Sequence, residues 1–226
     1  VKAGSSSTYL FGSVDAVARW AAYTTYSGGP FGQNSAVTLA NAAGTSLDLN
    51  GNMVVVGSIA GGGSLGGSLN LSNGGTLVFG GGSLVKNVST VASTSVLAGQ
   101  VTGNGNLVVT GGGTLKLTDT TFDILPDAGA ITFNVDSFTN AAGGSFIYTG
   151  GANSETVGAL TATTGHGIVS AVSGTLTFAS ATRSAGASVN IANPGTVNVT
   201  GTSGFVSSGI YFNGADFAFS GVGTTL

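Results

Sequence analysis

Several features that are common in globular proteins are scarce in this sequence, and each scarcity excludes a class of protein. Its 226 residues include no cysteine, so disulfide bridges and cysteine-based metal sites are not available. Charged residues make up 6% of the chain, against roughly 25% in ordinary soluble domains. The five cationic residues lie far apart, which argues against a nucleic-acid-binding or anionic-membrane-binding surface. No apolar run approaches the roughly 20 residues of a membrane-spanning helix.

Glycine, by contrast, supplies 41 residues and recurs before short alternating runs. Residues 75–79 (Gly-Thr-Leu-Val-Phe) repeat, eight positions later, the pattern of residues 67–71. A second pair occupies 105–109 and 113–117. Alternation of apolar and polar residues indicates strands with one buried face, and glycine between them indicates tight corners. The repeated unit predicts a stacked β architecture.

From residue 35 onward the pattern predicts strands and corners throughout, in one domain over residues 35–226. Asn50-Gly51 and Asn73-Gly74 are typical corner pairs. Proline occurs only three times, each time outside a predicted strand. The predicted strands are 36–39, 46–49, 53–56, 68–71, 76–79, 106–109, 114–117, 131–135, 146–148, 175–178, 188–191, 196–199, 205–206, 210–212 and 216–219.

Short strands and frequent Gly/Asn corners favour a parallel β-helix, also called a β-solenoid. We expect about nine to eleven turns of roughly 20–25 residues, forming a rod on the order of 50 Å long. An antiparallel β-sandwich is the alternative. In the β-helix, one continuous core is expected to contain Leu69, Leu71, Leu77, Phe79, Leu107, Val109, Leu115 and Leu117. The strand aromatics expected in that core are Phe79, Phe133, Phe178, Phe217 and Phe219.

Residues 1–34 are predicted to be a separate N-terminal element, either a strand or a helix that caps the solenoid. Ser13 is a suitable N-cap for a helix with Val14 and Val17 on one face, and an aromatic strand over 19–26 is the alternative. At the other end, residues 219–226 contain no charge, proline or amphipathic helix. An open end of this kind predicts head-to-tail stacking of identical subunits, with residues 1–26 of one meeting residues 205–226 of the next.

Three phrases carry a family resemblance: residues 74–79 (Gly-Gly-Thr-Leu-Val-Phe), residues 103–118, and residues 173–178 (Ser-Gly-Thr-Leu-Thr-Phe). They resemble the autotransporter-associated β-strand repeat found in the passenger regions of bacterial surface proteins. The resemblance implies export, a right-handed β-helical stalk, and surface display or adhesion. It implies no catalytic residues. Because the chain starts at Val1 without methionine, we expect one part of a longer polypeptide or a processed product.

Two catalytic motifs match the same glycine-rich segment. Residues 62–66 fit a nucleophile elbow around Ser64, and Gly61, Gly63 and Gly66 fit a dinucleotide-binding pattern. Both motifs need a helix directly after the turn, whereas this sequence continues as a predicted strand. We therefore expect no hydrolase or nucleotide-binding site here.

Other candidate site residues are few. His166 is the only histidine and lies between two glycines, which favours a corner residue over a catalytic base. Asp119, Asp123 and Asp127 lie in a predicted protruding loop, where a weak calcium site and a solvated acidic loop are the alternatives. Sequons for N-linked glycosylation begin at Asn70, Asn87 and Asn198.

These observations predict a non-enzymatic, structural or adhesive β-solenoid that is extracellular or on a bacterial cell surface. The expected partners are identical subunits and surface glycans, with no cofactor, no metal, no nucleic acid and no transmembrane segment. Two alternatives remain open. One is a carbohydrate-binding or carbohydrate-active β-helix protein. The other is a sandwich-type, pilus-like subunit in which residues 1–12 complete a neighbour's sheet.

Overall fold

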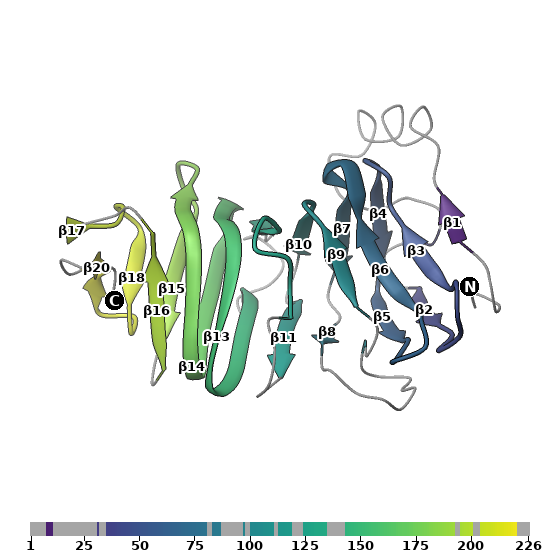
Figure 1. Ribbon diagram of the computed structural model, residues 1–226. Helices are drawn as coiled ribbons and strands as arrows, with labels where there is room; N and C mark the ends of the chain where they lie inside the picture. The colour runs from purple at the N-terminus through teal and green to yellow at the C-terminus, as the bar shows by residue number, and fades with distance from the viewer. Residues whose placement is uncertain are drawn as a thin grey trace.

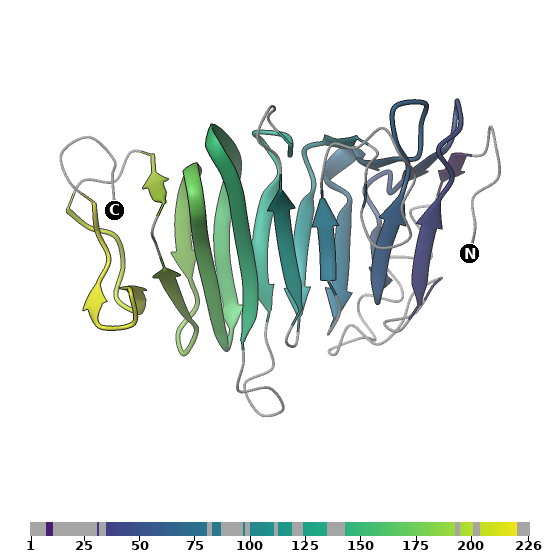
Figure 2. The ribbon, with the colours of Figure 1, turned by 90° about the horizontal axis from the view of Figure 1, so that it is seen from below.

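The computed structural model describes residues 8–10, 31, 35–80, 83–86, 97, 100–110, 113–118, 124–134, 143–192, 195–200 and 204–220. They form a parallel β-solenoid of about six turns, elongated along the winding axis (Figures 1 and 2). Neighbouring turns pair in parallel from β1 to β18, and the only antiparallel ladders in the described residues lie at the C-terminal end. The predicted β-helix is confirmed, and both the sandwich and the sandwich-type pilus subunit are excluded.

The strands of successive turns stack into three faces, which we call A, B and C. Face C contains β4 (Met53–Val56), β7 (Thr76–Gly80), β10 (Asn106–Thr110) and β12 (Ala130–Asn134). Face B begins with β1 (Thr8–Leu10), β3 (Ser46–Asp48), β6 (Ser68–Leu71) and β9 (Val101–Gly103). Face A contains β2 (Ala36–Leu39), β5 (Ser58–Gly61), β8 (Ser83–Lys86), β11 (Thr114–Thr118), β15 (Ser188–Ala192) and β18 (Ile210–Phe212).

Two long strands, β13 (Gly144–Thr164) and β14 (His166–Arg183), run around all three faces. Their first parts pair on face A with β11 and β15, their middle parts lie on face B, and their last parts continue face C. On face B the middle part of β14 also pairs with β16 (Thr196–Val199). The sequence predicts only short segments of each long strand, because alternation alone does not show that a strand continues through a bend.

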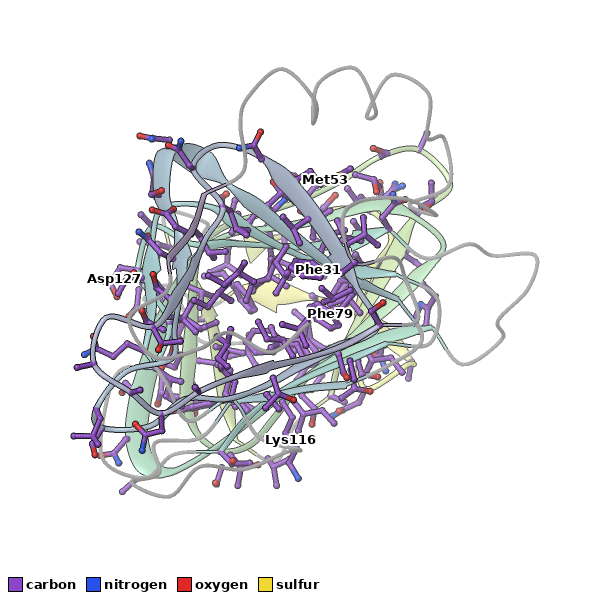
Figure 3. The ribbon with its side chains drawn as sticks, turned by 90° about the vertical axis from the view of Figure 1, so that its right-hand side faces the viewer. Phe31, Met53, Phe79, Lys116 and Asp127 are labelled. Carbon is purple, nitrogen blue, oxygen red and sulfur yellow. The ribbon has the colours of Figure 1, made fainter. Side chains whose placement is uncertain are left out.

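Inward-facing side chains form apolar columns parallel to the axis. On face C, Leu77, Leu107, Ile131 and Leu160 are register partners in successive turns, and each is at most 1% exposed. Viewed along the axis, Phe79 lies inside the ring of strands, whereas Lys116 and Asp127 lie outside it (Figure 3). The eight predicted core residues between Leu69 and Leu117 are all buried. Each turn therefore stabilises the next by burying one face of every strand.

The glycine before each alternating run has a steric cause. Gly75, Gly105, Gly129 and Gly158 follow one another at the corner that leads into face C, and the amide of Gly158 donates to the carbonyl of Gly129 at 2.7 Å. A Cβ at Gly105 would lie 1.9 Å from the carbonyl oxygen of Gly75. Because adjacent turns approach each other this closely, only glycine fits at the position.

Two expectations about size and ends need correction. The solenoid has about six turns instead of nine to eleven, because many of its turns are longer than the expected length of roughly 20–25 residues. Side-chain hydrogen bonds between neighbouring turns join residues 21 to 32 positions apart. The C-terminal end is folded back: β19 (Asp216–Phe217) pairs antiparallel with β18, and β20 (Phe219–Ser220) with β17 (Gly204–Phe205). Residues 13–27, the predicted helix, lie outside the described residues. In the described part of the chain, the 3-10 turn η1 (Ser72–Gly74) is the only helical element.

The fold-back also changes the prediction for one aromatic residue. Phe79, Phe133 and Phe178 are fully buried, as expected. The prediction that Phe217 lies in the core is wrong, because its side chain is 57% exposed. It stacks on Tyr211 with the ring centroids 5.6 Å apart, on the strand that turns back across the last turn. The side chain of Phe219 lies outside the described set.

Candidate functional site

The segment around Ser64 is a tight glycine turn between β5 and β6. The amide of Gly63 donates to the carbonyl of Gly66 at 2.8 Å, and the amide of Leu65 donates to Oδ1 of Asn41 at 2.9 Å. A Cβ on Gly66 would lie 2.0 Å from the carbonyl oxygen of Ala42, so the glycines are needed for packing. The helix that either catalytic motif needs is replaced by strand β6. The segment therefore lacks the geometry of a nucleophile elbow or a phosphate-binding turn.

His166 lies at the start of β14, where its side chain is half-buried. Its Nδ1 is 2.9 Å from Oγ of Ser188, the register partner on β15. No carboxylate among the described residues contacts the imidazole. The hydrogen bond joins two turns of the solenoid, which is a structural use of the side chain.

The acidic loop is only partly described. Asp119 and Asp123 lie outside the described residues, and Asp127 is exposed at a corner. Within the described ranges, no group of three His, Cys, Asp or Glu residues is placed to hold a metal ion. The choice between a solvated acidic loop, which the sequence favours, and a weak calcium site stays at the level of a prediction. Of the sequon residues, Asn70 and Asn198 lie in strands β6 and β16, and Asn87 lies outside the described set.

A buried carboxylate at the base of this loop was not anticipated. Glu155 in β13 is 0% exposed, and its side chain lies in an inward column with Leu176 and Val197. Its Oε2 accepts a hydrogen bond from the amide of Ile124 at 2.8 Å, and its Oε1 accepts one from the amide of Leu125 at 2.7 Å. A buried carboxylate is stable only when such donors satisfy it. Glu155 therefore fastens the loop between β11 and β12 to the next turn.

The position of this clamp follows from the topology. In the turn that contains β11 and β12, no described segment forms a strand on face B. Ile124 and Leu125 lie where a face B strand of this turn would run. Because no strand pairs with their amide groups in the usual way, the Glu155 carboxylate supplies the acceptors. The sequence does carry a signal for this position, although it was not predicted: Glu155 lies two residues before the apolar Val157, and residues two apart in a strand point to the same side.

The outward side of face B differs between its two halves. In the N-terminal half, Ser72 donates to Oδ1 of Asp48 at 2.5 Å and Thr102 donates to Oδ1 of Asn70 at 3.2 Å. At the adjoining corner, Nδ2 of Asn73 donates to Oδ1 of Asn50 at 2.7 Å. Polar side chains of successive turns thus pair with one another along the axis.

In the C-terminal half of face B, β13, β14 and β16 lie side by side (Figure 1), and their register places the outward side chains in two columns. Within the part of the chain that the structure describes, none of these six side chains makes a hydrogen bond. The columns consist of Ser154, Thr175 and Thr196, and of Thr156, Thr177 and Asn198.

Face C offers an internal comparison on the same two long strands. Thr161 in β13 and Thr182 in β14 are register partners whose hydroxyl oxygens lie 3.4 Å apart. Between the earlier strands β10 and β12 of the same face, Nδ2 of Asn106 donates to Oγ1 of Thr132 at 2.9 Å. Outward polar groups on face C are thus paired between turns, in contrast to those on the C-terminal half of face B.

Comparisons with known proteins agree with this architecture. The chain is 41% identical over 92 residues to the Adhesin BmaC autotransporter of Brucella suis biovar 1 (strain 1330). The matched stretch is 41% of this chain and 2% of that adhesin. No family model and no solved structure matches the chain. The chain is thus a β-solenoid with distant homology to an autotransporter adhesin. Among the described residues, no helix is long and apolar enough to span a membrane.

Proposed function

We propose that this chain is an adhesive segment of a secreted or cell-surface bacterial protein. The observation that carries the proposal is the homology to an autotransporter adhesin, found on a chain that folds as a parallel β-solenoid. A solenoid presents long regular faces whose outward residues are not needed for the core, so they are available for contact with another surface. The same homology favours a non-enzymatic role over a carbohydrate-active enzyme.

Adhesion is tested with the full chain coupled to fluorescent beads. We expect these beads to bind to epithelial cells or to a bacterial lawn more than beads coated with an inert protein of equal net charge. The variant Leu115→Asp, which we expect to unfold several turns, serves as a second control because it differs by one residue and loses the regular faces. Equal binding by all three bead types would contradict the proposal.

Head-to-tail assembly is a finer proposal. Residues 1–26 of one subunit would meet residues 205–226 of the next, and the small number of charges would offer little repulsion. Strand β19 already pairs with the outer edge of β18. A second subunit that stacks on this end would therefore have to pair with β19 or with another exposed strand, or displace β19 from β18. We expect sedimentation velocity to show concentration-dependent oligomers that disappear when residues 1–12 are deleted. A monodisperse monomer at high concentration would contradict this proposal and leave adhesion untouched.

A further inference from the structure

We propose that the outward side of face B in the C-terminal turns binds a neutral polysaccharide. The inference rests on the adhesive function proposed above and names the class of ligand. The surface, called here the hydroxyl array, is made by strands β13, β14 and β16, which lie side by side. It consists of Ser154, Thr175, Thr196, Thr156, Thr177 and Asn198.

The first argument is hydrogen-bonding capacity that is not used within the protein. Five of the six side chains carry a hydroxyl group, each with one donor and two acceptor lone pairs. In the described part of the chain, none of these hydroxyl groups has a hydrogen-bond partner within the protein. Oδ1 of Asn198 is buried without a partner and is therefore not counted among the groups that a ligand could reach. The comparable pair Thr161 and Thr182 on face C is within hydrogen-bonding distance. A ligand with hydroxyl groups would satisfy groups that the fold leaves open.

The second argument is regularity. Ser154 to Val157 keep one register with Thr175 to Phe178, and β16 continues it without a bulge. Neighbouring strands lie about 4.8 Å apart, and residues two apart along a strand are separated by roughly 6.6 Å. The array is therefore a grid with equivalent polar groups in successive turns. A polymer with repeating hydroxyl groups can bind such a grid at several points, so that individually weak contacts add.

The third argument is charge. No charged side chain stands in the two columns, because Glu155, the only acid in this part of β13, points into the core. The N-terminal half of face B, in contrast, carries Asp48. An ionic ligand would find no counter-charge on the array, whereas a neutral sugar needs none. Val172 is 45% exposed at the corner before Thr175, where it adds apolar surface for the C–H groups of a sugar ring.

The test uses affinity electrophoresis of the full chain in gels that contain mannan, β-glucan or galactan, with polygalacturonate as an acidic probe. We expect retardation in at least one neutral gel and none in the acidic one. The double variant Thr156→Val with Thr177→Val removes two hydroxyls and keeps their β-branched shape. We expect it to weaken binding by roughly 10- to 30-fold, the effect of two hydrogen bonds. The matched control, Thr161→Val with Thr182→Val, changes the same strands on face C and is expected to bind normally.

The outcomes separate this inference from the proposed function. Equal binding by both double variants, or no retardation of the wild-type chain in any neutral gel, would overturn the inference. Inhibition of ice growth without retardation would overturn it too, since the grid would then order water instead of sugar. Bead adhesion that persists unchanged in Thr156→Val with Thr177→Val would refute the array and leave the adhesive function standing. Thermal unfolding by circular dichroism verifies that each variant is folded.

Discussion

The two halves of face B both consist of parallel strands in register, and they differ in the hydrogen bonding of their outward strand side chains. In the N-terminal half, Asp48, Asn70 and their partners on neighbouring turns are hydrogen-bonded to one another. In the C-terminal half, the hydroxyl array has no such bonds within the described residues. Both halves nevertheless stack in regular parallel register. The backbone ladders and the inward columns are therefore sufficient for stacking in the C-terminal half, and the outward side chains of the array are available for another purpose.

Between the two halves lies the turn in which face B has no described strand. In this turn the core continues through the inward columns on faces A and C, where Leu115 is in register with Phe146 and Ile131 with Leu160. On face B, the hydrogen bonds between Glu155 and the loop take the place of a strand. A defect in this turn would separate the halves. The following predictions use that turn and the two halves, from the largest expected effect to the smallest.

Leu115→Asp is expected to have the largest effect. Leu115 is fully buried, and an aspartate there would place an unpaired charge in the core of the connecting turn. We expect a loss of more than about 4 kcal/mol in the free energy of unfolding, measured by urea denaturation with circular dichroism. The neighbouring Lys116→Asp is the control, because Lys116 points outward and should change stability by less than about 0.5 kcal/mol. Equal effects at both positions would contradict the assignment of faces.

Glu155→Ala is expected to cost about 2–5 kcal/mol, because it leaves two buried amide groups without acceptors. Glu155→Gln keeps one carbonyl oxygen and should lose about half as much. Hydrogen exchange gives the local measurement: the amides of Ile124 and Leu125 should exchange faster in Glu155→Ala while those of β4 and β7 do not change. Unchanged protection at both loop amides would show that the carboxylate does not hold the loop.

Gly105→Ala separates close packing from backbone conformation. The new Cβ would overlap the carbonyl oxygen of Gly75, and we expect a loss of about 2–3 kcal/mol. Gly74→Ala is the matched variant, because Gly74 has open space around it but a φ of +74°. It should cost only about 1 kcal/mol, the strain of a left-handed residue. A smaller melting-temperature shift for Gly105→Ala than for Gly74→Ala would refute the close approach of turns.

The alternation of apolar residues predicted the solenoid and its core well. Five strands were predicted with the bounds that the structure gives: β2, β4, β6, β16 and β18. What local pattern could not show is where a strand bends through a corner, as β13 does, or where a turn omits a strand. Both depend on neighbours one turn away. The number of turns was overestimated for a related reason. The corners between strands vary in length and contain no regular alternation, so the sequence does not show how many residues a full turn takes.

The functional surface was harder to predict than the fold. Ser64 and His166 match reactive patterns in the sequence, whereas in the structure one lies in a packed glycine turn and the other bonds to a neighbouring turn. Thr175 and Thr177 looked like ordinary outward strand residues. Their position beside Thr196 and Asn198 follows only from the register between β14 and β16. A surface made by stacking separate turns is not visible in any one segment of the sequence.

The smallest effect sharpens the comparison between the two halves of face B. Ser72→Ala removes the hydrogen bond to Asp48 in the N-terminal half, and should lower the free energy of unfolding by about 1 kcal/mol. Thr177→Val in the C-terminal half removes a hydroxyl that has no described partner and keeps a good strand-forming side chain, so stability should be unchanged or slightly higher. Urea denaturation of both variants measures the difference. If Thr177→Val destabilised the chain as much as Ser72→Ala, the hydroxyl of Thr177 would be a structural group. Both halves would then use their outward hydroxyl groups for stability, and the array would have no free hydroxyl groups to offer a ligand.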